Sequence, residues 1–150
     1  MKIANSIALI IALYGCAETD MALERNLDSV QLLMREQRWI EALCLLDELS
    51  PLGKGGELEA NLLRAECLVR SERGADTLAL AYSLLKTSTI DAEGLLAICD
   101  LLSEEEFLAE CNELARVGAV RFPASSELFS AREHIPEDEV AKELSRLLDL

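Results

Sequence analysis

Histidine, proline and aromatic residues are scarce in this chain of 150 residues. It has one histidine and three prolines, and aromatic residues make up 4%. Four short motifs are also missing: Cys-x-x-Cys, Gly-x-Ser-x-Gly, a phosphate-binding glycine loop and the EF-hand spacing. Their absence argues against zinc or redox sites, serine hydrolases, nucleotide-phosphate sites and calcium loops. We therefore expect no enzyme, no cofactor and no metal, and we interpret His134 as a surface residue that flanks a helix.

Positive charge is scarce as well. Lys and Arg number 14 against 28 Asp and Glu, so the formal net charge is −14. Such a surface repels the phosphates of nucleic acids and of anionic lipid headgroups. We expect no nucleic-acid partner and no small-molecule substrate. The charge favours a protein partner that offers a basic or an apolar patch.

The apolar stretch near the start is too short to cross a membrane as a helix, which needs about 20 residues. It runs from Ile3 to Leu13 with two polar residues, follows Lys2, and leads into Leu13-Tyr14-Gly15-Cys16. A positive residue, an apolar run and a small residue before the cleavage point form the order of a secretory signal. Leu13, Gly15 and Cys16 resemble the lipobox of bacterial lipoproteins.

This resemblance implies a division of the start of the chain. Residues 1–15 would be a lipoprotein signal peptide, Cys16 would carry the acyl chains, palmitate among them, and residues 16–20 would be a tether. Two or three acyl chains hold a protein stably at a membrane. Ala17 follows Cys16 where an Asp would indicate the inner membrane, so the resemblance implies the periplasmic face of the outer membrane. Residues 21–150 are then expected to form a single helical-repeat domain.

Apolar residues recur at spacings of three and four through the rest of the chain, which predicts amphipathic helices and an all-α fold. The expected helices cover residues 21–37, 38–49, 57–70, 75–87, 91–102, 104–120 and 125–132, with a last helix from Pro136. No segment alternates with period two for long, so no sheet is expected. The expected turns lie at Glu36–Arg38 and at Pro51–Gly56.

Two turns are assigned from particular residues. Gly74 is expected to take the left-handed conformation that ends the helix over 57–70. Ser103 and Glu106 have the spacing of a capping box and are expected to begin the helix over 104–120.

The helices pair through short turns and suggest an internal repeat. Gln37-x-Trp39-x-x-Ala42 and Gly74-x-Asp76-x-x-Ala79 lie 37 residues apart. This pattern is similar to the tetratricopeptide repeat, which implies antiparallel helix pairs in a short right-handed solenoid. The alternative is an irregular helical bundle. A solenoid has a concave face, and its groove candidates are Asn26, Asn61 and Arg64. The favoured alternative is that these residues occupy ordinary solvated positions.

Four cysteines besides Cys16 would meet an oxidising compartment if the chain is exported. Cys99 and Cys111 lie six residues either side of Glu105, so antiparallel helices would bring them to the same height. Cys44 and Cys67 flank the 51–56 loop less symmetrically. We expect a Cys99–Cys111 disulfide first and a Cys44–Cys67 disulfide second; the alternative is that these cysteines are buried thiols on helix faces.

These patterns together predict a lipid-anchored periplasmic adaptor or assembly factor. Its partner would be another envelope protein or a peptide segment of one, bound through a groove, and its membrane contact would be the lipid anchor. Small helical lipoproteins of this kind resemble pilotins, which escort channel subunits to the outer membrane. The alternatives are a structural accessory lipoprotein of an envelope complex and, with less support, an enzyme.

Overall fold

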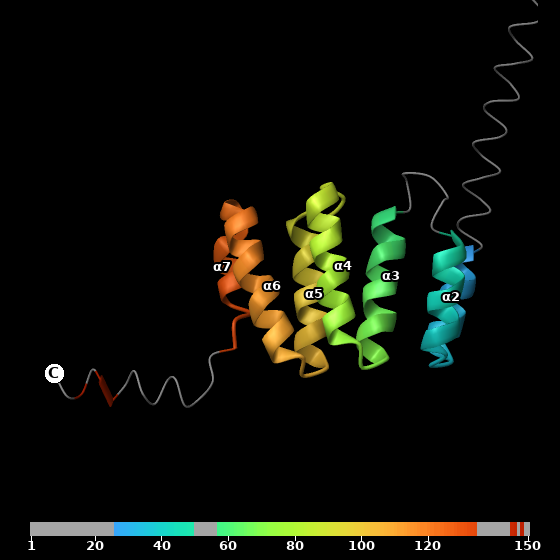
Figure 1. Ribbon diagram of the computed structural model, residues 1–150, viewed down its shortest axis with the longest axis horizontal. Coiled ribbons are helices and arrows are strands. Elements are labelled where there is room, and N and C mark those ends of the chain that lie inside the picture. The colour runs from blue at the N-terminus through green and yellow to red at the C-terminus, as the bar shows by residue number, and fades with distance from the viewer. Residues whose placement is uncertain (1–25, 50–56, 135–144, 147, 149–150) are drawn as a thin grey trace, which may run out of the picture. The chain divides into compact units, whose positions relative to one another are not determined.

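The computed structural model describes residues 26–49, 57–134, 145, 146 and 148. These residues form α-helices and one short 3-10 turn, with no β-strand among them, as Figure 1 shows. The predicted all-α fold is therefore confirmed for this part of the chain. The signal peptide over 1–15, Cys16, the tether and most of the last expected helix lie outside the described residues. No helix in the described part is both long and apolar enough to span a membrane.

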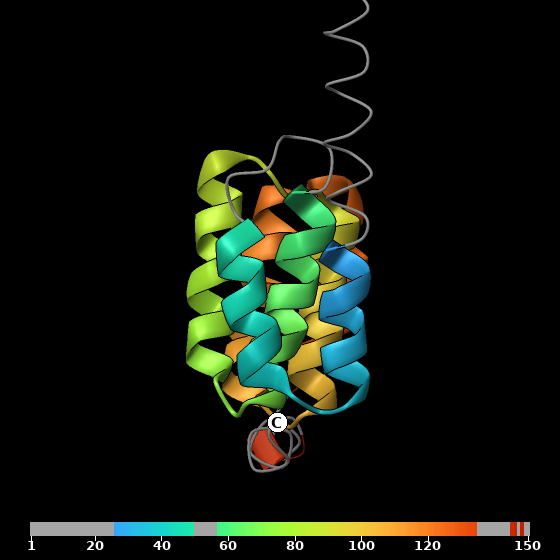
Figure 2. The same cartoon turned by 90° about the vertical axis from the view of Figure 1, so that its right-hand side faces the viewer.

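The chain divides into two compact units between Arg73 and Gly74, and each is described by itself. The first contains a helix over residues 26–35, α2 (Trp39–Leu49) and α3 (Glu57–Arg70). The 26–35 helix and α2 run antiparallel around a tight turn (Figure 2), and α2 packs against α3. The core of this unit consists of buried side chains at helical spacing: Leu27, Val30, Met34, Ala42, Leu43, Leu46, Leu49, Ala65, Cys67, Leu68 and Val69.

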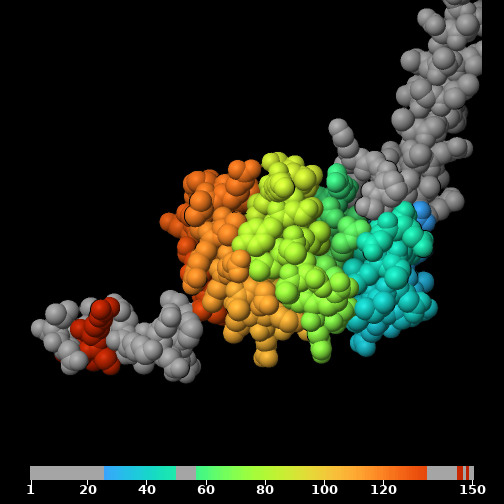
Figure 3. Space-filling view, viewed as in Figure 1, coloured from blue at the N-terminus to red at the C-terminus, as the bar shows by residue number. Residues whose placement is uncertain are grey.

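The second unit contains α4 (Gly74–Thr87), α5 (Ala92–Glu104), α6 (Leu108–Arg121), the 3-10 turn η1 (Pro123–Ser125) and α7 (Ser126–Ser130). Helix α6 packs against α4, α5 and α7, and the side chains of these helices form a continuous surface in Figure 3. Asp91 begins α5 by accepting a hydrogen bond from the Gly94 N–H at 2.8 Å. The Tyr82 hydroxyl on α4 donates to Glu113 Oε1 on α6 at 2.6 Å.

Phe129 is the largest side chain that the second unit buries completely. Its ring lies against the ring of Phe122, with the centroids 6.2 Å apart. It also lies directly on Gly118 of α6, where an added Cβ would be 2.3 Å from a ring carbon. A glycine is therefore required at position 118 for α7 to approach α6 this closely.

One kind of turn ends the 26–35 helix, α3 and α5. Its central residue is left-handed in each case: Gln37 with φ 59°, Glu72 with φ 61° and Glu106 with φ 63°. The N–H of that residue bonds the carbonyl three residues back, and the next N–H bonds the carbonyl five residues back, at 2.8–3.2 Å. These are the two hydrogen bonds of a Schellman motif, which satisfies carbonyls at a helix end.

We call these three the pair turns, because each joins the two helices of an expected pair. Their central positions, 37, 72 and 106, are almost evenly spaced along the sequence. Helix α4 ends in the same motif at Ser88, with φ 56°, and this turn leads from one expected pair to the next. The pair turns thus follow one another after 35 and 34 residues.

Two expected turn assignments are wrong. Glu72, not Gly74, takes the left-handed conformation after α3, and Gly74 begins α4, buried against the ring of Phe107. Ser103 is no N-cap, because α5 continues to Glu104 and α6 begins only at Leu108. The left-handed residue Glu106 reverses the chain between them.

Completely buried residues lie at the same distances from each pair turn. The residue seven before each pair turn is completely buried (Val30, Ala65, Cys99), and so is the residue five after it (Ala42, Thr77, Cys111). Ala42 and Thr77 therefore share the same burial at the same distance from a pair turn. Ala79, which the sequence pattern pairs with Ala42, is exposed on α4.

Candidate functional surfaces

The groove candidates Asn61 and Arg64 meet each other in the first unit. The Arg64 guanidinium donates from Nη1 to Asn61 Oδ1 at 2.9 Å, and from Nη2 to the Leu46 carbonyl and to Asp47 Oδ1, both at 3.1 Å. The Leu46 carbonyl is one of the last four of α2, which lack partners within their own helix. Arg64 therefore ties the end of α2 to α3, and Asn61, which is 7% exposed, orients it.

Asn26, the third groove candidate, is half-buried at the first described residue of its helix. It precedes Asn61 by the same offset that separates the pair turns at Gln37 and Glu72. The structure thus gives Asn61 and Arg64 a role in joining α2 and α3, whereas Asn26 is half-buried near the start of the 26–35 helix.

The predicted first cysteine pair comes together in the core of the second unit. Cys99 on α5 and Cys111 on α6 are completely buried, and the Cys111 thiol donates to the Cys99 carbonyl at 3.4 Å. Burial raises the pKa of Cys99 to about 12 and also raises the pKa of Cys111. Both groups are present as neutral free thiols in this structure.

The second predicted pair lies in two different environments. Cys44 is exposed on α2, whereas Cys67 is completely buried on α3, where burial raises its pKa to about 11. Both are free thiols here. The structure thus places the members of the first pair side by side, and it does not give the second pair a shared environment.

The segment that follows α7 is held by polar contacts that the sequence analysis missed. The Arg132 guanidinium makes a two-point ion pair with Asp100 of α5, at 2.6 Å and 3.0 Å, and donates to the Leu128 carbonyl at 2.8 Å. The Asn112 side chain of α6 bonds both backbone groups of His134, at 2.6 Å and 2.8 Å. These contacts fix the path of the chain as it leaves α7.

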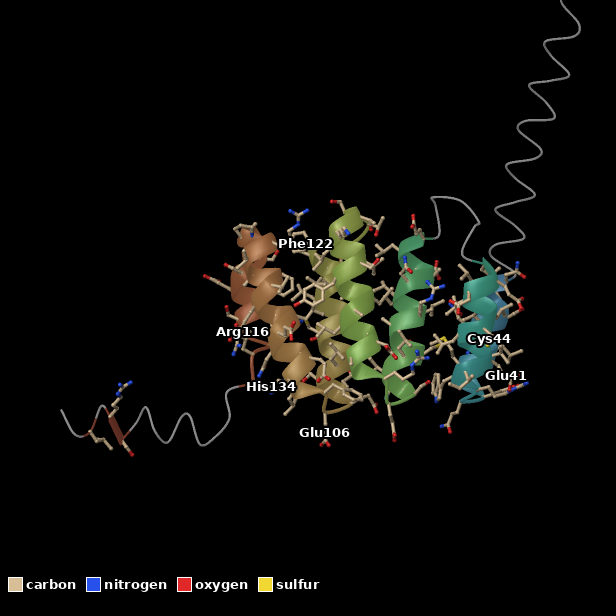
Figure 4. The ribbon with its side chains drawn as sticks, in the orientation of Figure 1. Glu41, Cys44, Glu106, Arg116, Phe122 and His134 are labelled. Carbon is tan, nitrogen blue, oxygen red and sulfur yellow. The ribbon has the colours of Figure 1, made fainter. Side chains whose placement is uncertain are left out.

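His134 also has a side-chain partner. Its Nε2 lies 2.8 Å from the Ser103 hydroxyl at the end of α5, and the imidazole is exposed near the bottom of the unit in Figure 4. A hydroxyl beside an imidazole is the pairing of nucleophile and base. Here the pair links the 131–134 segment to the end of α5, which agrees with the interpretation of His134 as a surface residue. Within the described residues, no group of three or more His, Cys, Asp or Glu side chains could hold a metal.

An open hollow of about 560 Å³ lies on the outer face of α6. Arg116, Val117, Val120 and Arg121 line it, and Val120 is 82% exposed. Figure 4 shows Arg116 pointing away from the body of the second unit. The buried positions of α6 are Cys111, Leu114, Ala115 and Gly118, so Val117 is only half-buried and Val120 lies outside the buried stripe.

Comparisons of the chain with protein-family models, with curated proteins and with solved structures find no match.

Proposed function

We propose that this protein is a lipid-anchored adaptor or assembly factor that binds another envelope protein at the periplasmic face of the outer membrane. The proposal has two parts: an anchor at Cys16 and a protein-binding body of degenerate tetratricopeptide-like helix pairs. A pilotin-like or scaffold role is the form we favour.

The binding role is supported chiefly by the near-even recurrence of the pair turns at Gln37, Glu72 and Glu106. Small or medium side chains are completely buried at the same places before and after each turn. Stacked helical repeats present surfaces to proteins and peptides rather than enclosed reaction sites. Among the polar candidates, Arg64 joins α2 to α3, and His134 links the 131–134 segment to the end of α5.

The anchor is supported by the sequence alone, through Leu13, Gly15 and Cys16 after the apolar stretch. If residues 1–15 are removed, the net charge changes from −14 to −15, because Lys2 goes with them. A body this acidic repels anionic headgroups. The acyl chains would therefore hold it at the membrane while the helices stay available to a partner.

The test is to identify what co-purifies with the membrane-tethered protein. We expect one dominant envelope partner from detergent-solubilised membranes of cells expressing the full chain. The matched control is Cys16→Ala, which should leave an unprocessed precursor without acyl mass and should lose the partner. Normal cleavage of Cys16→Ala in an intact-mass measurement contradicts the anchor. Several stoichiometric partners would favour the structural accessory role instead.

In the oxidising compartment that this location implies, we propose that Cys99 and Cys111 form a disulfide, with Cys44–Cys67 as the second pair. The support for the first pair is the burial of both thiols and the 3.4 Å contact across α5 and α6. A disulfide closing such a loop stabilises a protein by about 2–4 kcal/mol. Thiol counting on unfolded, unreduced mature protein should find fewer than four free thiols, and four would contradict both pairs.

A further inference from the structure

We propose that the C-terminal segment of this chain, residues 135–150, docks on the hollow of α6 that Arg116, Val117, Val120 and Arg121 line. The docked segment would cover the outer face of α6 within the same molecule. This inference does not depend on the lipid anchor or on the partner proposed above.

The hollow has a definite chemistry. Val117 and Val120 give it an apolar floor, and Arg116 and Arg121 add a positive charge on each side along the helix. Val120 is 82% exposed, which is unusual for a valine on a helix that is otherwise packed on three neighbours. An apolar floor with cationic edges fits an amphipathic segment whose apolar stripe is flanked by carboxylates.

The C-terminal segment has the complementary sequence pattern. Val140, Leu144 and Leu147 recur at spacings of four and three. Glu137, Asp138 and Glu139 precede this stripe, and Glu143 lies within it. Leu148 lies next to this stripe and is 84% exposed, so the structure records no contact between this residue and the hollow. The sequence after His134 therefore supplies an acidic segment with an apolar stripe, which matches the cationic, apolar hollow in charge and in character.

The described chain approaches the hollow at Glu133, next to Arg116, and continues to His134 beside Asn112. Asn112 holds the backbone of His134, and Arg116 lies 3.7 Å from the Glu133 carboxylate. Asn112, Arg116 and Val120 are spaced by four residues and so share one face of α6. From Asn112 to Arg121 the helix rises about 13 Å, at roughly 1.5 Å per residue. A helical segment of about ten residues starting near His134 is long enough to cover that distance.

Native trypsin digestion of the full chain tests this arrangement, because Lys142 and Arg146 are the two cleavage sites within residues 135–150. The rates of cleavage after these residues are measured by intact mass and compared with those of a free peptide of residues 133–150. We expect both sites to be cleaved at least ~10-fold more slowly in the protein, because a docked segment resists a protease until it opens.

Val120→Asp places a carboxylate on the apolar floor and should bring both rates to within about twofold of the peptide. Arg121→Glu reverses one of the two positive charges; the Arg121 side chain donates to the Ser88 hydroxyl at 3.5 Å, a contact at the surface. It should act the same way and provides a second variant should Val120→Asp fail to fold. The matched control is Ala79→Asp on the exposed face of α4, which should keep the wild-type rates. Far-UV circular dichroism verifies that each variant retains its helices.

Equal rates in the wild-type protein and the peptide would overturn the proposal, and would leave the hollow to an external partner. Equal effects of Val120→Asp and Ala79→Asp would overturn it as well. Protection that disappears on dilution together with a dimer, measured by light scattering, would assign the hollow to a second copy and would also overturn it. The proposal is supported if cleavage of the wild type is slow at every protein concentration. The variants Val120→Asp and Arg121→Glu must lose this protection, and Ala79→Asp must keep it.

Discussion

Replacement of Gly118 by alanine tests the packing of α7 on α6 directly. The added Cβ would lie 2.3, 2.5 and 2.7 Å from three carbons of the Phe129 ring. Carbon atoms prefer separations of about 3.5–4.0 Å, so the ring has to move by about 1 Å or more. It has little room, because Phe129 is completely buried and its ring is stacked with that of Phe122.

Two opposing terms set the expected magnitude. Overpacking of a closed core costs about 1–3 kcal/mol, and this overlap involves three atoms of a ring that cannot rotate away, which favours the upper part of that range. Glycine to alanine inside a helix gains about 1 kcal/mol. We therefore expect Gly118→Ala to lower the free energy of unfolding by about 1–2 kcal/mol.

A double-mutant cycle with Phe129→Leu isolates the contact. The smaller leucine leaves space for the new methyl group, so the double variant should lose at least ~1 kcal/mol less than the sum of the two single variants. The free energies come from urea unfolding followed by far-UV circular dichroism. A Gly118→Ala variant as stable as the wild type would refute the reasoning. The reasoning would also be refuted if the effects of Gly118→Ala and Phe129→Leu on the free energy of unfolding add within about 0.5 kcal/mol, as those of independent sites do.

Three further predictions concern the turns and the thiols. Glu106→Gly should raise the free energy of unfolding by about 0.5–1 kcal/mol, because glycine accepts a left-handed φ at low cost. The control Ala79→Gly, within α4, should lower it by about 1 kcal/mol. Urea unfolding of both variants measures the two changes. Brief alkylation of reduced Cys16→Ala protein, followed by peptide mapping, should find Cys44 modified long before Cys67, Cys99 and Cys111. The reason is that Cys44 is exposed and the other three are buried. Equal rates of modification would contradict this burial. Burial raises the pKa of Cys99 to about 12, so its neutral form is favoured in the folded state. This contribution to stability is complete below the ordinary thiol pKa and is lost as the pH rises toward 12. The free energy of unfolding of reduced Cys99→Ala should therefore fall less steeply over that interval than that of the reduced wild type. An equal slope in the two proteins would contradict the prediction.

The regular parts of the fold followed from the sequence. The helix over 57–70 was predicted with the bounds of α3, because Pro51 and three glycines precede it and its apolar residues keep a helical period. The turn at Glu36–Arg38 was also predicted correctly, although no glycine or proline marks it.

The turns at Glu72 and Glu106 could not be predicted by the rule that favours glycine. A left-handed conformation of glutamate costs little enough that helix packing on both sides can impose it. The glutamate side chain itself does not predict this conformation. What does carry information is the spacing of small buried residues, twelve apart across each turn: Val30 to Ala42, Ala65 to Thr77, and Cys99 to Cys111.

The candidate surfaces were predicted less well for a related reason. Periodicity assigns a residue to a face of its own helix but not to a partner on another helix. Arg64 was therefore recognised as a polar residue on α3, while its bond to the Leu46 carbonyl depends on how α2 ends against α3.

The division of the chain at Arg73 gives its single tryptophan a useful position. Trp39 belongs to α2 and thus to the first unit, and the chain has no other tryptophan. Emission from this indole reports the melting of one unit, whereas the circular dichroism signal averages over both. If the two units melt separately, Gly118→Ala will shift the dichroism curve and leave the fluorescence midpoint where it was; coincident shifts will mean that the chain melts as one cooperative body.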